Sequence, residues 1–143
     1  MSNFDTITAV TDNLESVLRG LGLKFTQEIY DDIAIIPASI LPHGQIFYEQ
    51  EVFEYAHGQK PEYATVVFRI RVALTGRDAR KFIRDQQNWA HKIREALTVN
   101  ALNIGALATS KLINMVSLNE VDVENTADRA SLMCRVEVRY REV

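Results

Sequence analysis

Residues 63–74 read YATVVFRIRVAL and alternate apolar with other side chains more regularly than the rest of the chain. This period of two, with its β-branched and aromatic content, predicts a strand with one buried face. The side chains expected in the core are the even-numbered ones, Ala64, Val66, Phe68, Ile70, Val72 and Leu74. The odd-numbered face carries Arg69 and Arg71, so we expect it to be the polar side of a sheet.

The segment before this strand predicts a second one. Residues 45–55 are rich in aromatic and β-branched side chains. Residues 56–61, AHGQKP, form a polar turn marked by glycine and proline. The two strands are therefore expected to make a long antiparallel hairpin with a projecting tip.

One helix is predicted before the hairpin in the sequence and another after it. Over residues 4–21, apolar side chains recur every three or four positions, with Ser2 or Asn3 as the cap and Gly20 and Gly22 at the end. The second helix is expected to open at residues 75–78, TGRD. Its predicted core stripe is Ala79, Phe82, Ile83, Gln86, Trp89, Ala90, Ile93 and Leu97.

Two further strands are predicted after a connecting loop at residues 101–108. Residues 111–123 read as a strand with a bulge near Leu118 and Asn119, where the alternation slips. The last strand is expected to point Leu132, Cys134, Val136, Val138 and Tyr140 inward, and Met133, Arg135, Glu137, Arg139 and Arg141 outward. The chain is thus predicted to be one α+β domain over residues 1–143, in the order α-β-β-α-β-β. Its sheet is mainly antiparallel, with about four strands and two helices on one face.

The apolar run at residues 33–41, which we call the arm, fits neither a regular helix nor a regular strand. Pro37 and Pro42 interrupt it, and proline removes a backbone donor and restricts the residue before it. We expect either a strand with a covering loop or a segment that packs on another subunit, because contiguous apolar surface commonly marks an interface.

Composition excludes several classes of protein. The net charge of −3 is too small for a typical nucleic-acid-binding domain. The single cysteine, Cys134, rules out an intrachain disulfide and is expected to lie in the core. We see no signal peptide and no window near the ~20 apolar residues of a membrane span. We therefore expect synthesis in a reducing cytoplasm and no membrane partner.

The residues that carry chemistry are scattered. His43 and His57 sit beside glycine in predicted loops, and His91 lies on a helix, without the i, i+4 spacing of a helical zinc site. No serine has a G-x-S-x-G elbow, and the six glycines form no phosphate loop. We therefore expect no enzyme activity, no cofactor and no metal.

In addition to the arm, the sequence predicts two polar surfaces. One is the row of arginines expected on the outer face of the two most regular strands, and the other is the basic flank of the second helix. Each reads either as a solvated face or as a docking surface for a partner. Together with the arm they give the predicted interface residues Ile33, Ile35, Ile36, Ile40, Leu41, Arg69, Arg71, Arg77, Arg80, Lys81, Arg84, Arg135, Arg139 and Arg141.

Five features along the chain carry a family resemblance. They are the hairpin at 45–74, the TGRD turn into the Trp89 helix, NAL at 100–102, the strand at 112–123 with its acidic stretch, and CRVEVRY at 134–140. This layout resembles the tail terminator (tail completion) proteins of long-tailed bacteriophages. The resemblance is a pattern of elements over nearly the whole chain and not a signature motif.

The resemblance implies a structural virion protein that assembles in the host cytoplasm. Members of the family form a hexameric ring that caps the head-proximal end of the tail tube, ends its polymerisation and provides the docking surface for the head connector. The implied partners are further copies of the chain, the tail tube protein and the connector or neck proteins. DNA would pass through the lumen without specific binding.

Other functions stay open at this point. A related phage neck, head–tail joining or tube-like protein would share parts of the layout. A small hydrolase or ligand-binding domain would need a pocket with convergent polar groups around a histidine. A nucleic-acid binder using the arginine face would show steeply salt-dependent binding, and the acidic net charge ranks it lower.

Overall fold

The computed structural model of the chain describes residues 2–76, 79–126 and 128–142. Its long elements are α1 (Asn3–Gly20), β1 (His43–Glu54), β2 (Tyr63–Thr75), α2 (Ala79–Ala96), β3 (Ile113–Asn125) and β4 (Arg129–Arg141). Its short ones are α3 (Val99–Leu102) and the 3₁₀ turns η1 (Ile33–Ile35), η2 (Ala38–Ile40) and η3 (Gly105–Leu107). The predicted α-β-β-α-β-β order is confirmed, and the end of α3 and all of η3 lie in the segment 101–108 that was expected to be a plain loop. No helix in the described part of the chain has the length and apolar character needed to cross a membrane.

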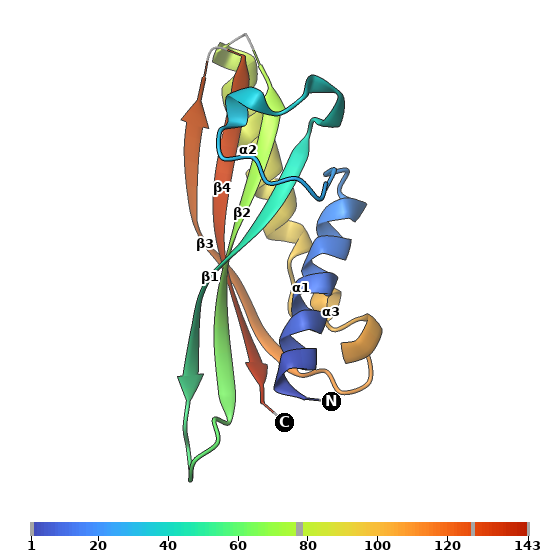
Figure 1. Ribbon diagram of the computed structural model, residues 1–143, viewed down its shortest axis with the longest axis vertical. Coiled ribbons are helices and arrows are strands. Elements are labelled where there is room, and N and C mark those ends of the chain that lie inside the picture. The colour runs from blue at the N-terminus through green and yellow to red at the C-terminus, as the bar shows by residue number, and fades with distance from the viewer. Residues whose placement is uncertain (1, 77–78, 127, 143) are drawn as a thin grey trace.

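The four strands form one antiparallel sheet in the order β1-β2-β4-β3. The hairpins β1–β2 and β3–β4 are joined through β2 and β4, which pair from Tyr63 opposite Arg141 to Thr75 opposite Arg129. Figure 1 shows α1 and α2 on one side of this sheet and the two hairpin tips at opposite ends of the molecule. The β1–β2 tip extends past both chain ends, so the predicted projecting hairpin is present.

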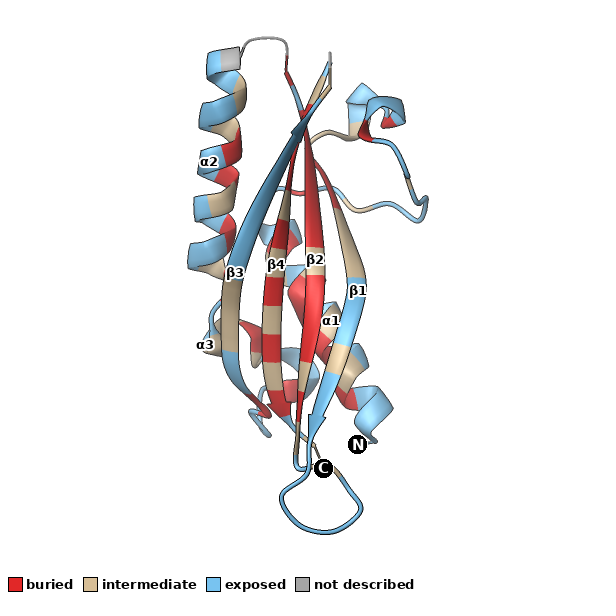
Figure 2. Ribbon diagram, turned by 90° about the vertical axis from the view of Figure 1, so that its left-hand side faces the viewer, coloured by how far each residue is buried: buried red, intermediate tan, exposed pale blue. Residues whose placement is uncertain are grey.

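The core lies between the sheet and the two long helices (Figure 2). All six even-numbered side chains predicted for β2 are buried, as are the five inward side chains predicted for β4, Cys134 among them. The prediction for Ile83 is wrong, because this side chain is 56% exposed. The helix presents Trp89 and Ile93 to the sheet, and Ile83 lies roughly 80–120° around the axis from both.

α1 begins and ends at its predicted signals. The Ser2 hydroxyl accepts a hydrogen bond from the Asp5 backbone N–H, and the Asp5 carboxylate accepts one from the Ser2 backbone N–H, both at 3.1 Å. This reciprocal pair is a capping box, which satisfies donors that the first turn leaves unpaired. The helix ends at Gly20, and Gly22 follows at a φ of 104°, a conformation that glycine adopts without strain.

β1 contains a bulge between Tyr48 and Gln50. Before the bulge the even-numbered side chains face the core, and after it the odd-numbered ones do, because Tyr48 pairs with Phe68 but Glu51 pairs with Val66. The extra residue is Glu49. The bulge predicted in β3 is also confirmed, between Leu118 and Glu120, and β3 has a second irregularity near its start.

The arm folds onto the sheet of its own chain, on the face opposite α1 and α2. Ile33 and Ile36 pack against Ala73, an odd-numbered side chain of β2, and are only 2% and 1% exposed. A 3₁₀ turn places side chains i and i+3 on the same side, so both isoleucines reach one patch. Of the two predicted alternatives, the structure therefore shows a segment that covers the sheet, and the prediction of Ile33 and Ile36 as interface residues is wrong because both are buried within the chain. Ile35 is 63% exposed, and two other arm residues, Ile40 and Leu41, are half-buried.

Candidate assembly surfaces

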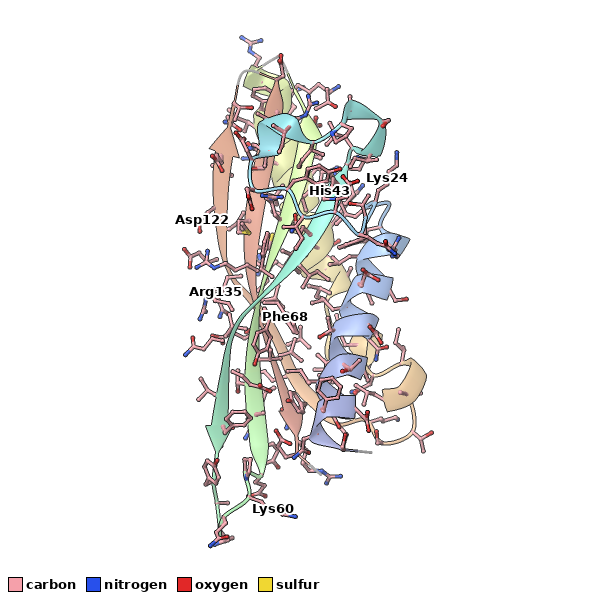
Figure 3. The ribbon with its side chains drawn as sticks, viewed as in Figure 1. Lys24, His43, Lys60, Phe68, Asp122 and Arg135 are labelled. Atoms are coloured by element: carbon pink, nitrogen blue, oxygen red, sulfur yellow. The ribbon has the colours of Figure 1, made fainter. Side chains whose placement is uncertain are left out.

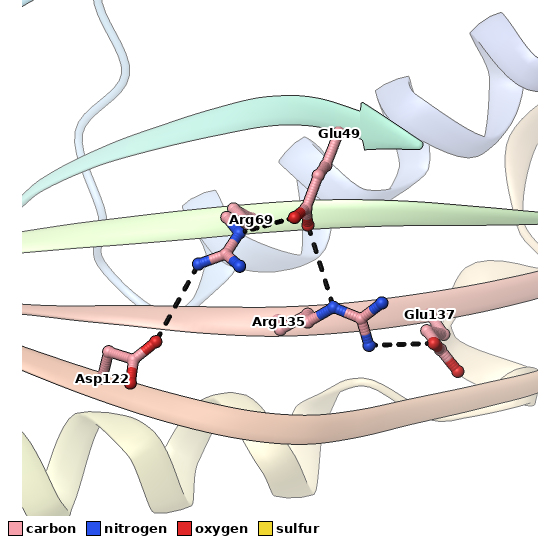
Figure 4. Close-up of polar contacts among 5 residues, drawn as sticks. All are labelled: Glu49, Arg69, Asp122, Arg135 and Glu137. Atoms are coloured by element: carbon pink, nitrogen blue, oxygen red, sulfur yellow. Dashed lines mark hydrogen bonds and ion pairs between the residues drawn. The ribbon is translucent and has the colours of Figure 1, made fainter. Parts of the chain in front are cut away.

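Five charged side chains, which we call the charged network, connect all four strands on the sheet face away from the helices (Figures 3 and 4). Glu49, from the β1 bulge, pairs with Arg69 of β2 at 3.0 Å and lies 3.8 Å from Arg135 of β4. Arg69 also approaches Asp122 of β3 at 3.9 Å, and Arg135 pairs with Glu137 at 2.9 Å. Because Arg69 and Arg135 are directly opposite in the register, Glu49 offsets the repulsion between two like charges.

The rest of the predicted arginine face lies toward the end of β4. Arg139 pairs with Glu54 at 2.8 Å, and its guanidinium lies 3.9 Å from the centroid of the Tyr63 ring, while Arg141 is exposed. The predicted face exists because β2 and β4 are neighbours. However, Arg69, Arg135 and Arg139 each pair with a carboxylate of the same chain, so the surface is mixed in charge and not uniformly basic.

Arg71 was predicted to lie on this exposed face, and its exposure is only 7%. Its guanidinium donates to the Tyr30 carbonyl at 2.6 Å and to the Gln45 side-chain oxygen at 2.8 Å, and it lies over the Phe47 ring. Burial lowers the pKa of Arg71 from its ordinary value, although an arginine stays protonated at neutral pH. Arg71 therefore fastens the segment before the arm to the sheet, and the prediction that it contacts a partner is wrong.

The basic flank of α2 lies on the surface. Arg80, Lys81 and Arg84 are exposed, and Arg77 lies outside the described residues. The exposed Ile83, which the helical pattern predicts to lie in the core, adds an apolar side chain to this flank. The surface of α2 is thus both basic and partly apolar.

The β1–β2 hairpin carries apolar side chains that the core does not cover. Val52, Phe53 and Tyr55 are 47%, 44% and 60% exposed, and the tip is closed by a bond from the Glu62 N–H to the Glu54 carbonyl at 2.8 Å. The start of α1 lies at the same end of the molecule (Figure 1), where Phe4 is 76% exposed. Apolar side chains gathered at one end indicate an interface more strongly than scattered ones do.

A groove of about 450 Å³ runs between α1, residues 25–29 and β1. All the charged side chains that line it are carboxylates: Asp12, Glu15 and Glu28. Aromatic rings of Phe25, Phe47 and Tyr48 also line it. The sequence does not reveal this groove, because its walls come from three separate segments that only the fold brings together.

The three histidines differ in burial and in the groups that they contact. His43 was expected in a loop but begins β1 and is 1% exposed, with Nε2 3.1 Å from the Thr26 hydroxyl. Burial and the nearby Arg71 lower the pKa of His43, so its ring is neutral at pH 7. His57 is exposed in the hairpin tip, and His91 pairs with Glu95 at 3.0 Å on the surface of α2.

The remaining groups with reactive chemistry are equally dispersed. Burial raises the pKa of the Cys134 thiol to about 12, which makes it a poor nucleophile in the folded protein. Over residues 2–76, 79–126 and 128–142, no three histidine, cysteine or carboxylate side chains are placed to hold a metal ion. What the described surface offers instead is a charged face, an apolar hairpin and an acidic groove.

No protein-family model matches the chain, and no curated protein sequence matches it significantly.

Proposed function

We propose that this chain is a structural protein of the virion, a tail terminator of a long-tailed bacteriophage. On this proposal it assembles in the host cytoplasm into a ring, hexameric in the family that it resembles, at the head-proximal end of the tail tube. The ring ends polymerisation of the tube and offers a docking surface to the head connector or neck proteins. DNA passes through the lumen without specific binding.

The β1–β2 hairpin is the observation that carries this proposal. It extends past both chain ends, and Val52, Phe53 and Tyr55 are exposed along it. A monomeric protein has little reason to keep such side chains at the end of an extended hairpin, whereas an assembling subunit covers them with a partner. The opposite end of the molecule holds the β3–β4 tip, so the subunit has two separate ends for two partners, as a cap between tube and connector requires.

The charged network supports the passage of DNA without capture. A surface that binds the phosphate backbone needs several uncompensated cations, since each neutralised phosphate contributes to affinity. Arg69, Arg135 and Arg139 instead lie within 3.0 Å of a carboxylate of their own chain. Mixed charges of this kind favour selective docking of a protein with complementary charges.

Capping of tubes tests the proposal. The purified protein, added to growing tail tubes, is expected to bind one end and stop elongation, as seen by electron microscopy. The double variant Val52→Ser, Tyr55→Ser is expected to stay folded, because both side chains are largely exposed, yet to lose capping. Lys60→Ser, a polar change at the same tip, is the matched control and should cap normally.

Two results would count against the proposal. Tubes that elongate unchanged in the presence of the unmodified protein would contradict the terminator function. A protein that itself extends into long tubes would favour the alternative, a tube-like component, because a terminator must stop growth.

A further inference from the structure

The acidic groove and the basic flank of α2 lie on opposite sides of the subunit. Figure 2 shows α2 at one side of the sheet, with β1 and α1 at the other. A ring requires a head-to-tail contact between two different surfaces of the same chain, placed so that each copy offers one to each neighbour. The acidic groove and the basic flank of α2 are placed in this way.

The groove has the chemistry to receive a basic and partly apolar segment. Its charged lining consists of Asp12, Glu15 and Glu28, of which Asp12 and Glu28 are exposed. Beside these carboxylates, Ile29 is 75% exposed and Tyr48 is 59% exposed. Glu15 is paired with Arg19 at 3.4 Å, so the groove presents the carboxylates of Asp12 and Glu28 beside uncovered apolar surface.

The outer face of α2 has the complementary chemistry. Ile83 is 56% exposed, and at about 100° per residue Arg80, Arg84 and Gln87 lie within roughly 100° of it around the helix. An isoleucine beside two arginines is the counterpart of an apolar groove lined by carboxylates. This face also explains why an apolar side chain on α2 stays out of the core.

We propose that the groove of one copy receives the outer face of α2 from the next copy, with Ile83 against the apolar lining and Arg84 facing the carboxylates. The contact is head-to-tail, so repetition produces a ring or an open filament. This inference rests on the proposed ring assembly and names the surface that builds it.

Charge reversal on each side tests the contact. The groove variant is Asp12→Lys, Glu28→Lys, and the helix variant is Arg84→Glu, Gln87→Glu; all four positions are exposed. Like charges would then face each other across the contact, so each variant alone is expected to assemble at least about a hundredfold more weakly than the unmodified protein. Lys60→Glu, a charge reversal at the hairpin tip, is the matched control and should assemble normally.

Mixing the two variants gives the decisive result. Each groove-variant copy can receive a helix-variant neighbour, and the reverse pairing is the unmodified contact, so a one-to-one mixture is expected to regain the full assembled mass. A single chain carrying all four substitutions is also expected to assemble. Circular dichroism and urea unfolding show whether each variant is folded, and rescue by mixing cannot occur with unfolded chains.

The outcomes separate this inference from the function on which it rests. If the unmodified protein assembles and both reversed variants assemble equally well, the contact is wrong and the ring proposal stands. If both variants lose assembly and mixing restores nothing, the pairing of these two surfaces is also wrong. If the unmodified protein is monomeric at every concentration and also beside tail tubes, both proposals fail.

Discussion

Glu49 owes its position to the bulge in β1, where it is the extra residue between Tyr48 and Gln50. The bulge aims its carboxylate across the sheet, so that one side chain pairs with Arg69 and approaches Arg135 on the two central strands. Bulges commonly re-aim a side chain in this way. The charged network therefore depends on a local irregularity of the backbone as well as on the residues themselves.

Replacing Glu49 by glutamine is expected to lower the free energy of unfolding by about 1 kcal/mol at low salt. Arg69 and Arg135 would then face each other without the carboxylate between them. The loss should shrink in 1 M NaCl, where screening weakens the repulsion. Urea unfolding at both salt concentrations measures this, with Gln50→Ala as a control at the same bulge. Equal stability of Glu49→Gln and the unmodified protein at low salt would contradict the account.

Glu142 gives the protein a pH dependence of defined sign. Burial, followed by the nearby charge of Glu51, raises the pKa of Glu142 above its ordinary value of 4.5. One of its carboxylate oxygens is buried and accepts no hydrogen bond from the described residues. The folded state thus holds this proton more tightly than the unfolded state does. Its contribution to stability is present at low pH and is lost as the pH rises from about 4.5 through the folded pKa.

The substitution Glu142→Gln is therefore expected to flatten the pH dependence above pH 4.5. At pH 7 it should raise the free energy of unfolding by less than about 1 kcal/mol, because Glu142 is only half-buried and solvent still screens its charge. Urea unfolding midpoints between about pH 4 and 8 measure the effect, with Glu120→Gln, an exposed position on β3, as the control. A variant less stable than the unmodified protein at pH 7 would contradict this reasoning.

At the scale of elements, the arm shows how two arginines hold an irregular segment on the sheet. Arg71 reaches the Tyr30 carbonyl from β2, and Arg129 of β4 donates to the Ile36 carbonyl at 2.9 Å. These two bonds bracket η1, and Ile33 of η1 and Ile36, which follows it, pack against Ala73. The arm is thus held by two arginines and an apolar patch, and not by a regular hydrogen-bond ladder.

Arg71→Met is expected to lower the free energy of unfolding by about 2 kcal/mol, because two hydrogen bonds from a buried charged group are lost. The arm should also open more often, so limited proteolysis followed by mass spectrometry should show faster cleavage around residues 29–35. Arg84→Met, at an exposed position, should change stability by less than about 0.5 kcal/mol. Unchanged cleavage of the arm in Arg71→Met would show that Arg71 does not hold it.

The sequence predicted the regular elements well, because their signals are local. The alternation in β2 and β4, the stripe of α1 and the bulge in β3 all follow from side-chain period and turn chemistry within a few residues. The arm, Arg71 and the groove could not be predicted in this way. Their positions depend on which distant segments meet. Arg71 lies at an odd position of β2, so the alternation predicts that it is exposed, and only the fold shows the segment that covers it.

At the scale of the whole molecule, the candidate contact surfaces of the subunit lie in different directions. The two hairpin tips lie at opposite ends of its long axis, and the acidic groove and the basic face of α2 lie at opposite sides (Figures 1 and 2). In the proposed assembly, contacts at the sides would join equal copies around a ring, and contacts at the ends would join the ring to what lies above and below it. Such a separation would let one fold serve in-plane assembly and axial docking without competition between them.

Self-association of the unmodified protein into a closed ring is the central claim of this account. Size-exclusion chromatography with light scattering measures the assembled mass directly. We predict one discrete species whose mass stays constant as concentration rises, at six times the 16.3 kDa subunit if the resemblance to tail terminators holds. A monomer at every concentration and beside tail tubes, or a mass that grows without limit, would contradict the claim of a closed ring.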